Sequence, residues 1–183
     1  AGVFLPLQDQ GVPDEGHFGK IFYNNARLSA MGIPQIAAVM GPCVAGGAYL
    51  PVMCDKYIIV EGASMFLAGP ALVKAAIGQE IDTDTLGGAN THSAISGTAD
   101  YHEKDDLAGI QRIKSVMSTM NLETHSAFIP SEVKEPALDP NEMIGVFNPD
   151  VPGQYDVREI IARIVDGSEF NEFKKTYGKS LLC

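Results

Sequence analysis

Residues 33–48 read Ile-Pro-Gln-Ile-Ala-Ala-Val-Met-Gly-Pro-Cys-Val-Ala-Gly-Gly-Ala, and this stretch decides the fold. Its first half, residues 33–40, is a short apolar run, which predicts a strand buried on both faces. The glycine and proline that follow end the strand abruptly, and a short helix is expected from Ala48 to Val52. The tandem Gly46 and Gly47 permit unusual backbone dihedrals and a close approach by another group.

The backbone amides of Gly46, Gly47 and Ala48 are therefore the candidate catalytic groups. Amides at a helix N-terminus lack intrahelical acceptors and lie at the positive end of the helix dipole. Such donors can stabilise a developing oxyanion. A tight turn that needs glycine only for packing explains the same residues equally well. Neither a phosphate loop nor a serine hydrolase is indicated, because no Gly-Lys-Ser/Thr and no Gly-x-Ser-x-Gly occurs.

The flanking elements follow the order of an α/β protein. We expect a strand ending at residues 3–5, a loop over 8–16, strands over 56–60 and 64–68, a glycine-rich turn over 86–90, and helices over 17–31, 70–77, 105–120, 156–165 and 169–177. Only the turn at residues 61–63 separates two of these strands, which interrupts a regular βαβ rhythm. A repeating β-β-α unit therefore fits better than a doubly wound sheet.

Composition excludes several classes of protein. The 183 residues carry a net charge of −10, which argues against a general binder of nucleic acid or of anionic membranes. No run of 18 apolar residues predicts a spanning helix. The cysteines at 43, 54 and 183 fit neither a disulfide framework nor a Cys-x-x-Cys zinc site, so we expect no metal and a reducing compartment. Because the chain starts without methionine inside an expected strand, we interpret it as a piece of a longer polypeptide.

No general base stands out among the side chains. Each of the four histidines is interpreted more readily as a surface residue, with His92 as the best exception because it follows the glycine-rich residues 86–90. Glu80, Asp82 and Asp84 are interpreted as a solvated face. The sequence thus offers a candidate oxyanion hole without an evident base.

Several stretches resemble the carboxyltransferase (beta) subunits of biotin-dependent acyl-CoA carboxylases, and in particular their methylcrotonyl-CoA carboxylase branch. They are HFGKIFYNNARLSA (17–30), GIPQIA (32–37), GPCVAGGAYLP (41–51), FLAGPALVKAA (66–76), LGGA (86–89) and DVREIIARIVDGS (156–168). The resemblance runs in order through nearly the whole chain, which makes it more specific than any single motif.

The resemblance implies a crotonase-like β-β-α superhelix, present here as a partial domain. It implies that residues 1–121 are the latter part of an N-terminal carboxyltransferase domain and that 156–183 are a helical connection towards a C-terminal domain. Residues 122–155 are predicted to be a linker or arm because five prolines at 130, 136, 140, 149 and 152 interrupt any regular pattern. The resemblance also implies a homo-oligomer of beta subunits, a hexamer in this family. The expected partner is an alpha subunit that carries the biotin carboxylase and the biotin carboxyl carrier.

The implied reaction moves a carboxyl group from carboxybiotin to an acyl-CoA such as 3-methylcrotonyl-CoA, a step of leucine degradation. In this family the biotin anion left after CO2 release takes the proton, which explains why no protein base stands out. Enzymes acting on geranyl-CoA, propionyl-CoA or other acyl-CoA substrates, decarboxylase carboxyltransferases, and a non-catalytic fragment that serves assembly remain alternatives. The compartment would be bacterial cytoplasm or, alternatively, the mitochondrial matrix.

The resemblance also assigns roles by motif position. The amides of Gly46, Gly47 and Ala48 would stabilise the oxygen of the acyl-CoA dienolate. The predicted substrate-binding residues are Tyr49 and Leu50 in the acyl pocket, and Gly87 and Gly88 in the wall of the acyl or pantetheine channel.

Overall fold

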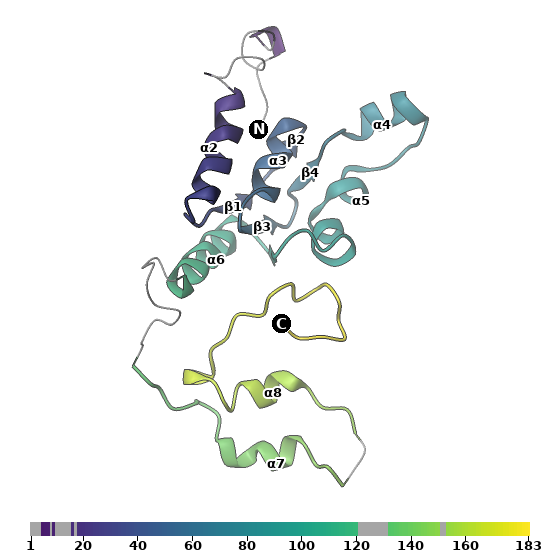
Figure 1. The fold of residues 1–183 in the computed structure, drawn as a ribbon. Coiled ribbons are helices and arrows are strands. Elements are labelled where there is room, and N and C mark those ends of the chain that lie inside the picture. The colour runs from purple at the N-terminus through teal and green to yellow at the C-terminus, as the bar shows by residue number, and fades with distance from the viewer. Residues whose placement is uncertain (1–4, 8, 10–15, 17, 121–131, 151–152) are drawn as a thin grey trace. The chain divides into compact units, whose positions relative to one another are not determined.

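The computed structural model describes residues 5–7, 9, 16, 18–120, 132–150 and 153–183 (Figure 1). The chain divides into two compact units, which are described separately. Unit 1 comprises Ala1–Thr119 with Thr176–Gly178, and unit 2 comprises Met120–Lys175 with Lys179–Cys183. The strand end expected at residues 3–5 and the loop at 8–16 lie mostly outside the described residues, and Leu5 begins the short 3-10 helix η1 (Leu5–Leu7).

Unit 1 contains two parallel sheets. The first has the order β1-β3-β5, and the second pairs β2 with β4. Their bounds are β1 Ile36–Val39, β2 Pro42–Val44, β3 Lys56–Val60, β4 Ser64–Phe66 and β5 Tyr101–Glu103. Each of the first two β-β steps thus sends its first strand to one sheet and its second to the other, which confirms the predicted β-β-α unit. Strands β2 and β5 were not predicted, because three residues are too few for a clear pattern.

The helices of unit 1 agree largely with the sequence. They are α2 Phe18–Ala30, α3 Gly46–Val52, α4 Pro70–Ile77, α5 Thr83–Gly87, the π-helix η2 Thr91–Ile95, and α6 Asp106–Thr119. Gly32 follows α2 with a φ of +71°, a left-handed conformation that suits the end of a helix. Helix α3 begins at Gly46, two residues before the predicted Ala48.

The predicted turn at residues 86–90 is wrong. The Asp82 side chain caps α5 by accepting a hydrogen bond from the Thr85 amide, and the helix runs through Gly87. Gly88 ends α5, and the π-helix starts at Thr91. The glycines misled the prediction because they serve close packing at the end of a helix rather than a turn.

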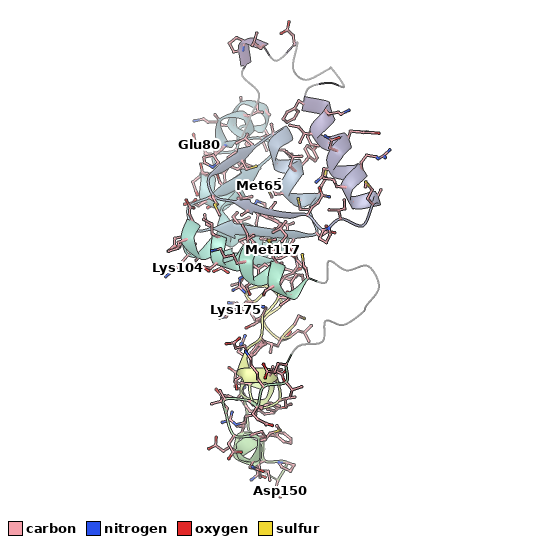
Figure 2. All side chains as sticks on the ribbon, turned by 90° about the vertical axis from the view of Figure 1, so that its left-hand side faces the viewer. Met65, Glu80, Lys104, Met117, Asp150 and Lys175 are labelled. Carbon is pink, nitrogen blue, oxygen red and sulfur yellow. The ribbon has the colours of Figure 1, made fainter. Side chains whose placement is uncertain are left out.

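The core of unit 1 lies around β3. Ile58 and Ile59 are fully buried, and Val60 contacts α6 at Gly109, where a β-carbon would lie 3.0 Å from a Val60 methyl. Figure 2 shows Met65 within the body of this unit and Glu80 at its edge. In contrast, α4 has no buried residue, and its Ile77 is 72% exposed.

Unit 2 is built from short turns of helix. They are η3 Pro140–Glu142, α7 Met143–Val146, α8 Val157–Ile161 and η4 Asp166–Ser168. Asp156 caps α8 as expected, although the helix is shorter than predicted. The helix expected over residues 169–177 is wrong, because Ser168 and Lys174 adopt positive φ angles of 62° and 51° that break a right-handed helix.

The described part of the expected linker, residues 132–150 and 153–155, contains η3 and α7. Arg163, which is 9% exposed, fastens η3 to α8 through ion pairs with Glu142 at 3.1 Å and Glu159 at 2.9 Å. Among the helices of the described residues, none is both long and apolar enough to cross a membrane.

Candidate active site

The candidate site forms where β2 passes directly into α3. Ala45 is the single residue between the strand and the helix, with φ 54° and ψ −128°. Its amide donates to the carbonyl oxygen of Phe66 at 3.1 Å, which ties this junction to the end of β4. The first amides of α3 therefore follow the strand without an intervening loop.

The three amides predicted to form an oxyanion hole are not equivalent. The Ala48 amide donates to the carbonyl oxygen of Ala45 at 3.0 Å, so it is already satisfied. Within the described residues, no acceptor is found for the amides of Gly46 and Gly47. Gly47 is buried and Gly46 is half-buried. Two adjacent unused donors thus stand at the positive end of α3, where they can bind an oxyanion.

Aromatic side chains from α2 flank these donors. A β-carbon on Gly46 would lie 2.9 Å from the Phe18 ring, so any larger residue would have to displace that ring. Phe22 makes edge contacts with the Phe18 ring at 5.2 Å and with the Tyr49 ring at 6.4 Å between centroids. These contacts hold α2 beside α3 (Figure 1). The spacing of Phe18 and Phe22 indicates an inward helix face, but the sequence gives no sign that this face meets Gly46.

The two predicted pocket residues after the glycines differ in exposure. Tyr49 is 51% exposed, so its ring is available to a ligand. Leu50 is half-buried, and its carbonyl oxygen accepts a hydrogen bond from the Cys54 thiol at 3.2 Å. Burial raises the pKa of that thiol above its usual value, which makes Cys54 a poor nucleophile.

Gly87 lets α5 pack closely on β4, and Gly88 is crowded by its own helix. A β-carbon on Gly87 would overlap the carbonyl oxygen of Met65, and one on Gly88 would lie 2.7 Å from the carbonyl oxygen of Asp84. Phe66 links this contact to the candidate oxyanion hole, because its ring lies against Gly87 while its carbonyl accepts from the Ala45 amide. Close packing accounts for both glycines, and their place in a channel wall stays a prediction.

His92 has a structural role. Its Nε2 lies 2.7 Å from the carbonyl oxygen of Met65, which can only accept, so Nε2 carries the proton. Its Nδ1 lies 2.9 Å from the Thr98 hydroxyl. Both ring nitrogens are therefore engaged, Nε2 in holding η2 to β4 and Nδ1 in a contact with the segment that follows η2.

Sequence reasoning missed two polar features of unit 1. His102 bridges Glu61, at 2.6 Å from Nε2, and the buried Ser93 hydroxyl, at 3.3 Å from Nδ1. The Tyr57 hydroxyl is buried without a hydrogen-bond partner among the described residues. Burial, with smaller contributions from Cys43 and Asp100, raises the pKa of Tyr57 well above its ordinary value. The described residues contain no cluster of three or more side chains that could hold a metal ion.

Comparison with known proteins gives the class of this chain, a carboxyl transferase domain. The family model for the carboxyl transferase domain matches residues 1–183, and the chain belongs to that family. It is 44% identical over 183 residues to the mitochondrial methylcrotonoyl-CoA carboxylase beta chain of Dictyostelium discoideum. It is 46% identical over 182 residues to the biotin-dependent 3-methylcrotonyl-coenzyme A carboxylase beta1 subunit of Mycobacterium tuberculosis. All or 99% of this chain is covered, but only 31% and 34% of those relatives, so the chain spans about a third of their length.

Solved structures of the same kind confirm the predicted crotonase-like fold. The transcarboxylase 12S structure with hydrolysed methylmalonyl-coenzyme A bound matches with a TM-score of 0.74 and 36% identity, covering 90% of this chain and 32% of that one. The beta subunit of Pseudomonas aeruginosa geranyl-CoA carboxylase matches with a TM-score of 0.59 and 36% identity, covering 100% of this chain and 34% of that one.

Proposed function

We propose that this chain is part of a carboxyltransferase that moves a carboxyl group from carboxybiotin to a short branched acyl-CoA such as 3-methylcrotonyl-CoA. The methylcrotonoyl-CoA carboxylase beta chains among its relatives support this substrate. The observation that carries the mechanism is the pair of unused amides at Gly46 and Gly47. The rest of the active site would come from the remaining two thirds of the protein.

The Gly46 and Gly47 amides would bind the thioester carbonyl oxygen and stabilise the negative charge that develops on it when the acyl group loses a proton. One donor of this kind contributes about 2.7–4 kcal/mol to the lowering of a barrier. The Phe18, Phe22 and Tyr49 rings would shield the acyl group from water on one side. Biotin carried by a partner subunit would supply the anion that accepts the proton. The donor set fits that role, since two neutral N–H groups bind an oxyanion without adding a competing base.

This proposal includes copies of the beta subunit and a biotin-carrying alpha subunit as partners. Hexamer assembly is described for the transcarboxylase 12S relative and supports the first of these. The proposed compartment is the cytoplasm if the protein is bacterial and the mitochondrial matrix if it is eukaryotic.

The experiment substitutes Gly47→Val in the full-length enzyme assembled with its biotin-carrying partner. We expect turnover of 3-methylcrotonyl-CoA to fall by about 10²–10³-fold, because a branched side chain closes the approach to the amides. Gly41→Ala is the matched control, since a β-carbon at Gly41 meets nothing within 4 Å. Wild-type turnover in a folded Gly47→Val enzyme would refute the assignment.

A second candidate is a non-catalytic fragment that serves subunit assembly. Helix α4 favours it, because most of its eight residues are apolar and none is buried, as expected of a surface that contacts another subunit. In that case the chain alone would bind acyl-CoA without turnover, and addition of the missing portion would not restore activity.

A further inference from the structure

Ala45 holds a backbone conformation that alanine rarely adopts. Its φ of 54° with ψ of −128° lies outside the regions open to residues with a β-carbon. Hydrogen bonds on both sides maintain it, because its amide donates to Phe66 and its carbonyl accepts from Ala48. Strain that the surroundings enforce in this way is concentrated at functional sites.

The same arrangement carries the nucleophile in hydrolases that contain Gly-x-Ser-x-Gly. There the nucleophile sits on a strained turn between a strand and a helix, and the next residue's amide contributes to the oxyanion hole. Here Ala45 joins β2 to α3, the next amide is the unused one of Gly46, and Gly47 stands two residues after the turn. The position of the nucleophile is thus occupied by an exposed methyl group.

The native thiol nearest in sequence is directed elsewhere. The Cys43 Sγ donates to the carbonyl oxygen of Gly47 at 3.2 Å and is half-buried. Neither Ala45 nor Cys43 therefore presents a free nucleophile beside the Gly46 amide.

We propose that Ala45 is a positioning residue with a protective role. Its strained backbone orients the Gly46 and Gly47 amides towards the thioester oxygen. Its methyl group keeps reactive atoms away from the thioester carbon. The thioester then survives until the acyl group is carboxylated. This inference rests on the function proposed above.

The test places a nucleophile at that position by Ala45→Cys in the full-length enzyme, with 3-methylcrotonyl-CoA as the probe. A helix N-terminus lowers the pKa of a thiol and favours its thiolate. The sulfur introduced by this substitution would attack the thioester carbon, form a new carbon–sulfur bond and break the bond to the CoA sulfur. CoA would leave as a thiolate and take up a proton from water.

We expect the intact mass of the variant to rise by one acyl group, with release of one CoA thiol per subunit and the adduct mapped to residue 45. The matched control is Ala75→Cys on α4, which is exposed and should gain no adduct, as should the wild-type enzyme. A folded Ala45→Cys enzyme that binds the probe but gains no adduct would overturn the inference. Equal adducts at residues 45 and 75 would do the same. Failure of the proposed function looks different, since the wild-type enzyme assembled with its biotin-carrying partner would then not carboxylate the probe.

Ala45→Gly keeps the inference testable if the cysteine variant does not fold. Glycine adopts this backbone conformation without strain but no longer enforces it. We expect kcat to fall by roughly tenfold or more with little change in KM, because the donors lose their fixed direction. An unchanged kcat would mean that Ala45 has no positioning role.

Discussion

His92 Nε2 lies 2.7 Å from the carbonyl oxygen of Met65, so a side chain of the π-helix η2 donates a hydrogen bond to the middle residue of β4. The same carbonyl oxygen faces Gly87, where a β-carbon would overlap it. The hydrogen bond to Met65 gives His92 a structural role, which accounts for its place next to the glycine-rich residues 86–90 without a role as a catalytic base.

Replacement of His92 by alanine should therefore lower stability rather than catalysis. The carbonyl of the buried Met65 would lose its hydrogen bond from His92, at a cost of about 1–3 kcal/mol for an unsatisfied buried group. Urea unfolding of the variant measures the loss, with Ile95→Ala as the control because the Ile95 side chain is 69% exposed on the same π-helix. A His92→Ala enzyme that keeps its stability but loses turnover would show that His92 acts in the chemistry.

Substitution Tyr57→Phe should leave stability unchanged or raise it by about 1 kcal/mol, because the buried hydroxyl has no hydrogen-bond partner among the described residues. The pKa of Tyr57 is raised, so this residue favours the folded state fully below the ordinary tyrosine pKa of about 10. As pH rises above that value towards the raised folded pKa, the unfolded state loses its proton first and the folded state is destabilised. Alkaline unfolding followed by circular dichroism should thus occur at higher pH in Tyr57→Phe. A midpoint equal to that of the wild type would mean that the hydroxyl is solvated.

Gly87→Ala should destabilise unit 1 by about 1–3 kcal/mol or more, since its β-carbon would overlap the Met65 carbonyl and neither backbone can move freely. Thermal unfolding gives the measurement. Gly41→Ala serves again as the control, because its β-carbon meets no atom within 4 Å. If the two variants melt alike, α5 does not pack on β4 as described.

In unit 2, Arg158 donates from Nε to Glu172 at 2.9 Å and lowers the pKa of that carboxyl. The ion pair stabilises the fold above the ordinary glutamate pKa of about 4.3, and its contribution is lost as pH falls through the lower folded pKa. Glu172→Gln should therefore be less stable than the wild type near neutral pH, and the difference should vanish in acid. Urea unfolding at a series of pH values tests this, and a difference that persists in acid would exclude the ion pair as its cause.

The sequence predicted the elements whose patterns are local. Helix α4 covers residues 70–77 as expected, and the apolar run 56–60 is β3 without change. It could not place β2, whose three residues include a proline, or show that Phe18 packs on Gly46, because that contact joins separate elements. The amides of Gly46 and Gly47 could be proposed from the glycine pair. The hydrogen bond from the Ala48 amide to the Ala45 carbonyl depends on the backbone dihedrals of Ala45, which no sequence pattern reveals.

The alternation of strands between two sheets constrains how the polypeptide acquires its shape. None of the described strands pairs with its immediate successor, since Ile36 aligns with Lys56 and Pro42 with Ser64. The described strands therefore offer no hairpin that could form early, and the connecting loops must close before strand pairing can compensate for the lost chain entropy. During synthesis, β1 would remain unpaired until β3 has left the ribosome, and its apolar residues would be accessible to chaperones until then.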